Sequence, residues 1–266
     1  MECEGIDHEQ VYRLSCTGDR AQDDSSPAKR WDLREGSGSM HAAPHCFCIL
    51  IYRNMCEKPV QNEYTEKVFA SENTIQFYNQ TAQDYDQSLQ TFNGPKILAD
   101  TCMRHLQKDE KILDLGCGTG LQGEMLKRQG FCNVHGLDGS EQMLQVARAK
   151  NIYQSYTCEF LDPHRLSVIP NGSFDALISV GVWCPGHLTS DHVTLLLDMI
   201  RPQGKFVAAL RECYFDTTLG NQKDPLNLRE KLEDLERHGR ITRVELNVVP
   251  NYIFGDKGVT YVAKVN

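Results

Sequence analysis

From about residue 72 onward, apolar residues recur at spacings that predict regular secondary structure. In the first such stretch they lie three or four positions apart, at Ile75, Tyr78, Ala82, Tyr85 and Leu89. This spacing puts all of them on one face of a helix. Proline is common in the first turn of a helix, so we expect Pro95 to open a second helix that runs to about residue 106.

Further along the chain, short apolar segments alternate with amphipathic ones. Seven segments predict strands: 111–115, 133–138, 155–160, 174–180, 205–210, 241–249 and 258–265. Helices are predicted between most of them, and Ser140 and Gly130 fit the start of one helix and the end of another. Repeated strand–helix units imply a parallel sheet with helices on both faces. The fold expected is a Rossmann-like three-layer α/β sandwich with a seven-stranded, mostly parallel sheet.

The last two predicted strands differ from the others because no helix separates them. Two consecutive strands without a crossover pair as an antiparallel hairpin. We therefore expect segments 241–249 and 258–265 to form such a hairpin at one end of the sheet.

The first 60 or so residues have a different composition. Segment 20–40 is rich in Ser, Gly and charge and has neither a helical nor a strand period, which is typical of disorder. The apolar run 46–52 interrupts it, either as a short docked segment or with no folded role. We expect a disordered arm over 1–65 and one domain over 66–266, in which 66–108 forms a helical lid.

Composition narrows the classes of function. The net charge is −8, whereas binders of nucleic acid or anionic membranes carry basic surfaces, so we expect neither partner. The longest N-terminal apolar run is far shorter than the roughly 18 residues of a membrane span. The start of the chain has no apolar signal region, which predicts a cytoplasmic protein whose 11 cysteines are reduced. Nuclear entry is left open, and we expect a monomer. Cys46, Cys48 and Cys56 lack paired metal-ligand spacing, so no metal site is expected.

The segment between the first predicted strand and the following helix carries the clearest chemical signal. It places Gly116, Gly118 and Gly120 at alternate positions after Asp114. Glycines let the backbone turn sharply and approach a ligand, and the helix N-terminus offers N–H groups to an anion. A plain tight turn is the alternative, although alternating glycines between a strand and a helix favour a binding loop.

A dinucleotide site is a second interpretation of the same loop. Gly118, Gly120 and Gly123 match the spacing G-x-G-x-x-G. However, an acid precedes the first glycine of the loop by two residues, and the remaining chain only completes one sheet. A dehydrogenase needs a substrate domain as well. A nicotinamide-dependent oxidoreductase is therefore the less favoured reading.

Asp114 with its three glycines, followed by an acid that ends the next strand, resembles the class I S-adenosylmethionine-dependent methyltransferases. The similarity covers about residues 72–266. Segments 77–89, 112–120 and 174–181 together resemble a narrower group within it, the methyltransferase-like proteins of the Williams–Beuren critical region.

The resemblance implies a set of cofactor contacts. The loop Gly116–Gly118–Gly120 would pass the methionine part of S-adenosylmethionine, and Asp114 would orient its ammonium group. Asp138 would accept the two ribose hydroxyls. Leu161 would lie against the adenine and Asp162 would bind its amino group, although Pro163 lacks the N–H usual at the next position.

The lid and the segment after the fourth strand would complete the site. Tyr85 and Ser179 are also predicted to contact the cofactor, whereas Tyr78 fits core packing at least as well. Segment 179–187 lies where the methyl group would point. His187 is the one candidate general base there, and an inert surface histidine is the favoured alternative.

The function expected is in-line methyl transfer from S-adenosylmethionine to an unidentified small-molecule or protein acceptor. A catalytically silent domain that binds the cofactor and serves as an interaction module is the alternative.

Overall fold

The computed structural model describes residues 71–89, 91–184, 186–215, 226 and 228–266. All of them belong to one compact unit, Ala42–Asn266. The expectations for the arm 1–65 and the apolar run 46–52 lie outside the described residues.

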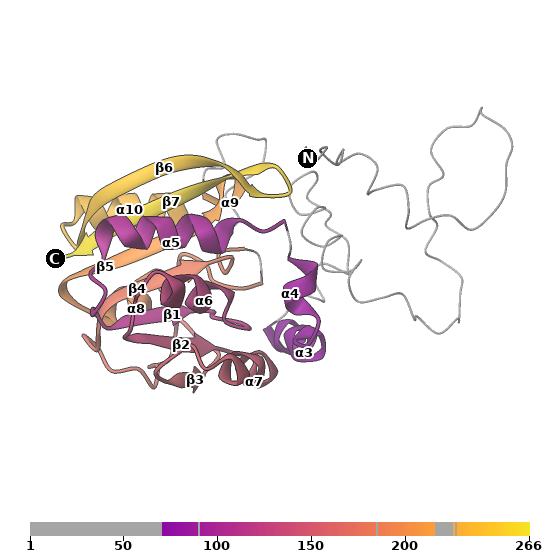
Figure 1. The fold of residues 1–266 in the computed structure, drawn as a ribbon. Helices are drawn as coiled ribbons and strands as arrows, with labels where there is room; N and C mark the ends of the chain where they lie inside the picture. Colours follow the sequence, from indigo (N-terminus) through magenta and orange to yellow (C-terminus); the bar gives the residue numbers. More distant parts are fainter. Residues whose placement is uncertain (1–70, 90, 185, 216–225, 227) are drawn as a thin grey trace, which may run out of the picture. The chain divides into compact units, whose positions relative to one another are not determined.

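Seven strands form one mixed sheet in the order β3-β2-β1-β4-β5-β7-β6 (Figure 1). The strands are β1 Ile112–Leu115, β2 Val134–Asp138, β3 Tyr156–Cys158, β4 Phe174–Val180, β5 Ile200–Arg211, β6 Ile241–Ile253 and β7 Asp256–Val265. The first five run parallel, and β7 pairs antiparallel with both β5 and β6. The mostly parallel sheet with a terminal antiparallel hairpin is confirmed. Its strand order reverses between β1 and β4, which is where α/β sheets open a crevice for ligands.

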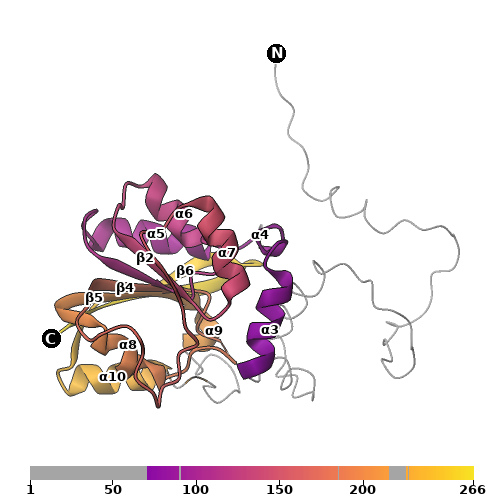
Figure 2. The same cartoon turned by 90° about the horizontal axis from the view of Figure 1, so that it is seen from below.

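Helices cover both faces of the sheet (Figure 2). On one face lie α5 Gly94–His105, α6 Leu121–Arg128 and α7 Glu141–Lys150, and on the other lie α8 His192–Asp198, α9 Glu212–Phe215 and α10 Leu228–Arg237. The predicted signals at helix ends are present: the Ser140 hydroxyl accepts a hydrogen bond from the Met143 N–H at 3.2 Å, and Gly130 takes a positive φ of 88° after α6.

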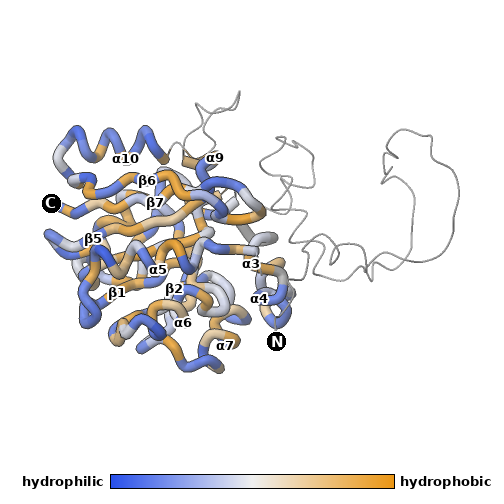
Figure 3. The backbone as a smooth tube through the Cα atoms, turned by 45° about the horizontal axis from the view of Figure 1, so that its top comes forward, coloured by the Kyte–Doolittle hydropathy of each residue, from blue (hydrophilic) through white to orange (hydrophobic). Residues whose placement is uncertain are grey.

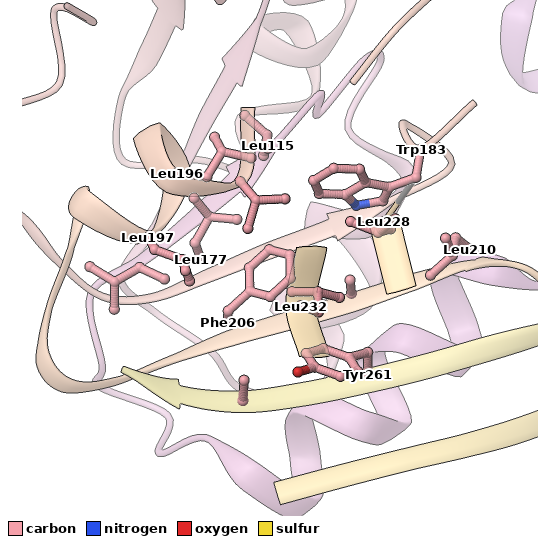
Figure 4. Packing of buried hydrophobic residues seen from close by; sticks show 14 of the residues in the cluster. Leu115, Leu177, Trp183, Leu196, Leu197, Phe206, Leu210, Leu228, Leu232 and Tyr261 are labelled. Carbon is pink, nitrogen blue, oxygen red and sulfur yellow. The ribbon is translucent and has the colours of Figure 1, made fainter. Parts of the chain in front are cut away.

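Two hydrophobic clusters fill the space between sheet and helices. Residues of a strand point alternately to the two faces, so Ile112 packs toward α5 and α6 while Leu113 packs toward α8. Figure 4 shows the cluster that contains Leu113, in which Trp183 and Phe206 lie among the leucines of α8 and α10. The tube of α10 is mostly blue in Figure 3, and this helix buries only Leu228 and Leu232.

The helix predicted over the stripe Ile75–Leu89 is broken into two. The structure has α3 Ser71–Thr81 and α4 Tyr85–Ser88, with turns between them. The Thr81 hydroxyl bonds back to the Phe77 carbonyl at 3.0 Å, and the Asp84 N–H bonds to the Thr81 carbonyl three residues earlier. These bonds compete with the continuing helical ladder, so the single-helix prediction is wrong at residues 82–84.

The end of β6 reaches back to the start of α5. The Asn93 N–H donates to the Tyr252 carbonyl at 2.9 Å, and the Asn93 side-chain amide donates to the Asn251 carbonyl at 2.8 Å. Phe92 and Ile253 form an isolated bridge. The chain that leaves α4 is thereby fixed to the end of β6.

Two further expectations concern membranes and cysteines. Of the helices in the described part of the chain, none is long and apolar enough to cross a membrane. Five described cysteines are free, as expected, but Cys213 is disulfide-bonded. The expectation of fully reduced cysteines rested on the absence of an export signal, which carries no information about an individual pair.

Candidate cofactor and acceptor site

One cavity opens at the carboxyl ends of β1, β2, β4 and β5. Helices α3 and α4, the loops after β3 and β4, and the end of β6 complete its walls. Six of the predicted site residues line it: Tyr85, Gly116, Gly118, Asp138, Leu161 and His187. The other four are not part of its walls, although each lies within two positions of a wall residue in the sequence: Asp114, Gly120, Asp162 and Ser179.

The carboxylate of Asp138 ends β2 and faces this cavity. One of its oxygens accepts the Gly118 N–H and the other the Ser140 N–H, each at 2.8 Å. Burial raises the pKa of Asp138 above its ordinary value, and the N–H groups of Ser140, Gly118 and Gly139 act against that rise. Each oxygen still has a lone pair after one backbone bond. A fixed carboxylate of this kind can accept two hydroxyl hydrogens from a neighbouring diol.

The glycine loop passes beside Asp138 in a left-handed backbone conformation. Gly116 and Gly118 have φ values of 64° and 51°. A Cβ atom on Gly116 would lie 2.2 Å from the Val182 Cγ1 atom, whereas one on Gly118 would meet nothing within 4 Å and would project into open space. Gly116 is therefore needed for the close approach of the loop after β4, and Gly118 leaves room for a ligand.

Gly120 and Asp114 serve the packing beneath the loop. Gly120 begins α6 with a φ of 92°, and a Cβ atom there would lie 2.1 Å from the Ile152 Cδ1 atom. Asp114 is buried and accepts the Tyr153 hydroxyl at 2.6 Å. Burial raises its pKa to about 7. Contact of Asp114 with the cofactor ammonium stays a prediction.

Of the predicted site residues after β3 and at the end of β4, one lines the cavity and two make structural contacts. Leu161 lines the cavity. Asp162 accepts the His164 N–H at 2.9 Å and pairs with Arg165, which fits a turn residue. Ser179 is fully buried, and its hydroxyl accepts the Trp183 indole N–H at 2.9 Å. Ser179 thus holds the loop that follows β4, and its cofactor role also stays a prediction.

Helices α3 and α4 are joined to the glycine loop and to α7 by polar contacts. The Thr119 hydroxyl donates to one oxygen of Asp86, and the other oxygen pairs with Lys150 at 2.6 Å. On α3, Asn79 accepts the Ser140 hydroxyl at 2.6 Å. These contacts hold Tyr78 and Tyr85 over the cavity, with their ring centroids 5.9 Å apart.

The loop after β4 meets the lid at His187. Its Nε2 atom lies 2.7 Å from the Tyr78 hydroxyl, and its Nδ1 atom lies 3.2 Å from the Cys184 sulfur. Thr74 on α3 also donates to the Gly186 carbonyl at 3.4 Å. Tyr78, for which core packing was an equally good prediction, is therefore a wall of the cavity.

Several wall residues had not been predicted. They are Phe160, Arg211, Tyr214, Tyr252 and Ile253. Tyr252 and Ile253 come from the hairpin, more than 100 residues after the glycine loop, and no spacing rule connects them with it. Val182 and Trp183 also line the cavity, within the predicted segment 179–187.

Comparison with known proteins finds methyltransferases. A family model described as a methyltransferase domain matches residues 112–204, which include the glycine loop and Asp138. Methyltransferase-like protein 27 of Homo sapiens is 32% identical over 170 residues, which cover 62% of this chain and 66% of that protein. The chain is thus similar to the class I S-adenosylmethionine-dependent methyltransferases, and residues 112–204 match their domain. It spans just under two thirds of the length of this human methyltransferase-like relative.

Solved structures agree on the methyltransferase fold. A putative methyltransferase from Haloferax volcanii, in complex with the Trm112 methyltransferase activator, superposes with a TM-score of 0.54 at 15% identity, covering 74% of this chain and 97% of that one. The [4+2]-cyclase SpnF superposes with a TM-score of 0.55 at 14% identity, covering 74% and 96%. At these identities the likeness concerns the fold alone.

The match to a methyltransferase domain indicates S-adenosylmethionine as the cofactor. The residues present fit it. The fixed Asp138 carboxylate suits a ribose diol, the open space at Gly118 admits a ligand beside the backbone, and Leu161 supplies an apolar surface for a flat base.

Proposed function

We propose that the chain transfers the methyl group of S-adenosylmethionine to a small-molecule or protein acceptor bound in the same cavity. The arrangement of Asp138 is the observation that supports this best. Its carboxylate is fixed by two backbone N–H groups at one end of a cavity whose other end is the loop after β4. A cofactor bound at Asp138 and an acceptor at that loop would share one cavity.

In this proposal the protein contributes position more than reactive groups. The bound cofactor supplies a methyl group on a sulfonium, which an aligned nucleophile can attack directly. Asp138 would hold the ribose, Gly116 and Gly118 would let the backbone pass the methionine part, and Leu161 would contact the adenine. Holding two reactants in line can supply about 7–11 kcal/mol of a barrier.

Replacing Asp138 tests the cofactor site. Asp138→Asn keeps the shape of the side chain but removes its charge and one of its acceptors. A hydrogen bond to a charged group contributes about 1.5–3 kcal/mol. We expect S-adenosylhomocysteine to bind at least about tenfold more weakly, measured by titration calorimetry. Asp109→Asn, an exposed carboxyl outside the cavity walls, is the matched control. Equal affinity of wild type and Asp138→Asn would refute the assignment.

Two other functions remain to be separated from methyl transfer. The cyclase SpnF has a similar fold, so the fold alone does not fix the reaction. The first of these other functions is that of a silent module that binds the cofactor without transferring its methyl group. Incubation of the protein with cell extract and labelled S-adenosylmethionine distinguishes this module from a methyltransferase, since a silent module labels nothing. Calorimetry with NAD tests the oxidoreductase, for which we expect no binding heat.

The domain limits and the setting of the protein are proposals on sequence grounds. We propose that 66–266 is the methyltransferase domain and that 66–108 is its lid. We also propose a monomer in the cytoplasm without nucleic-acid partners. Light scattering of the purified chain and imaging of the tagged chain in cells test these points.

A further inference from the structure

Three side chains from two separate segments form a chain of polar contacts along the cavity wall. The Tyr78 hydroxyl of α3 lies 2.7 Å from His187 Nε2, and His187 Nδ1 lies 3.2 Å from the Cys184 sulfur. All three residues line the cavity. The Tyr78 and His187 rings meet edge to face, with centroids 5.5 Å apart, so the hydroxyl and the imidazole are held in a defined geometry.

The protonation states of this chain can be assigned in part. Burial raises the pKa of Cys184 to about 12, so its thiol keeps its proton near neutral pH. A neutral imidazole has one N–H and one acceptor nitrogen. If the Nδ1–H of His187 points to the Cys184 sulfur, Nε2 accepts the Tyr78 O–H. In that tautomer the phenol oxygen can take a proton from the cavity as it passes its own to Nε2.

The cavity walls formed by β4, β5, the segments that follow them and the end of β6 suit proton transfer through Tyr78 and His187. The walls there are largely apolar and aromatic: Val180, Val182, Trp183, Leu210, Tyr214 and Ile253. The charged wall residue Arg211 is buried and lowers the pKa of Cys184, and it forms an ion pair with Asp256. That pair offsets the repulsion that a cation on His187 would meet. Glu159 and Asp138 line the cavity from the β2–β3 side.

We propose that the methyl acceptor is a neutral hydroxyl or amino group on a small, largely apolar molecule, and that its proton passes through the Tyr78 hydroxyl to His187. This inference rests on the proposed methyl transfer. An apolar chamber under a lid selects a small molecule, and a two-residue proton path serves an acceptor that must lose a proton. A carboxylate or a thioether has none to lose.

The step balances in atoms and electrons. The acceptor oxygen or nitrogen forms a bond to the methyl carbon, and the carbon–sulfur bond breaks with its electron pair going to sulfur, which becomes a neutral thioether. The acceptor proton moves to the Tyr78 oxygen, the Tyr78 proton moves to His187 Nε2, and the resulting imidazolium later releases a proton to water.

The atom that receives the methyl group gives the first test. The full chain is incubated with cell extract and S-adenosylmethionine carrying a ¹³C-labelled methyl group, and the ¹³C shift of the transferred methyl identifies the atom to which it is bonded. We expect an O-methyl ether or an N-methyl product in the small-molecule fraction. A C-methyl, S-methyl or ester product, or a labelled protein, overturns this inference and leaves methyl transfer standing. No transferred methyl overturns both.

Variants then test the proton path with the acceptor so identified. General acid–base catalysis contributes about 10²–10⁴-fold to a rate. We expect His187→Gln to lower kcat at least about a hundredfold and Tyr78→Phe at least about tenfold. The KM for acceptor and the affinity for S-adenosylhomocysteine should stay within about twofold. His238→Gln, on an exposed histidine after α10, is the control. A loss confined to KM, or unchanged kcat in either variant, contradicts the path.

A measurement without turnover tests the geometry itself. Nitrogen NMR of the cofactor-free protein reports which ring nitrogen of His187 carries the proton. We expect a protonated Nδ1 in the wild type and a clear shift of the Nε2 signal in Tyr78→Phe. An Nε2-protonated ring in the wild type, or an unchanged Nε2 signal in the variant, overturns the assignment.

Discussion

The buried carboxyl of Asp114 makes the stability of the fold depend on pH. Its side chain is 1% exposed within β1, and the Tyr153 hydroxyl donates to it at 2.6 Å. Burial is the largest influence and raises its pKa from 3.8 to about 7, the Tyr153 bond lowers it, and the charge of Asp138 raises it. The folded chain therefore holds this proton more tightly than the unfolded chain does.

The sign and the size of the effect follow from linkage. Below the pKa of Asp114 in the unfolded chain, its carboxyl is protonated in both the folded and the unfolded state. The contribution of this protonated carboxyl to the free energy of unfolding is therefore fully present there. As the pH rises from about 4 to about 7, the unfolded state loses its proton first and that contribution is lost. The difference between pKa values of 3.8 and about 7 corresponds to about 4 kcal/mol.

Asp114→Asn removes this titration while its amide oxygen still accepts the Tyr153 hydroxyl. In urea denaturation we expect wild type and variant to have similar free energies of unfolding near pH 4. By pH 8 the variant should be the more stable, by up to about 4 kcal/mol. Asp109→Asn, at an exposed carboxyl, should show no such trend. A difference between wild type and Asp114→Asn that does not change with pH would refute the reasoning.

Three further predictions concern the lid and the arm. Amide exchange across residues 73–92 should slow markedly on adding S-adenosylhomocysteine, more than in segment 205–210 of β5, because a lid is less stable when empty; equal protection with and without ligand would make it a fixed element. Tyr85→Phe should weaken S-adenosylhomocysteine binding by about 0.5–1.5 kcal/mol in calorimetry if the hydroxyl reaches the ligand, and unchanged affinity would exclude that contact. A chain beginning at Glu66 should melt and bind S-adenosylhomocysteine like the full chain; a melting temperature lower by many degrees would show that the arm packs on the domain.

Local patterns were enough to predict most of the fold. Each strand is a short apolar run between turn residues, and helix ends such as Ser140 and Gly130 carry their own signals. The antiparallel hairpin followed from a missing crossover helix, which is a property of one segment. The glycine loop and Asp138 could be predicted for the same reason, since both are fixed by the strands that they follow.

Features that depend on distant contacts could not be predicted in this way. Tyr78 and Tyr85 lie seven positions apart on one apolar stripe, and only the position of His187 shows that Tyr78 faces a cavity. The break after Thr81 depends on a bond of its hydroxyl that competes with the helix. Ser179 was predicted from its place at the end of the fourth strand, but its hydroxyl accepts the Trp183 indole N–H.

The two ends of the cavity come from different parts of the chain, and this separation bears on how such a protein can diverge. The walls near Asp138 come from the contiguous stretch 115–161 together with α3, whereas other walls come from the loop after β4, the end of β5 and the end of β6. Substitutions or insertions in the hairpin turn or in the loop after β4 would change what enters the chamber and leave the cofactor half untouched. Proteins that diverge from one ancestor could in this way come to bind new acceptors while using the same methyl donor.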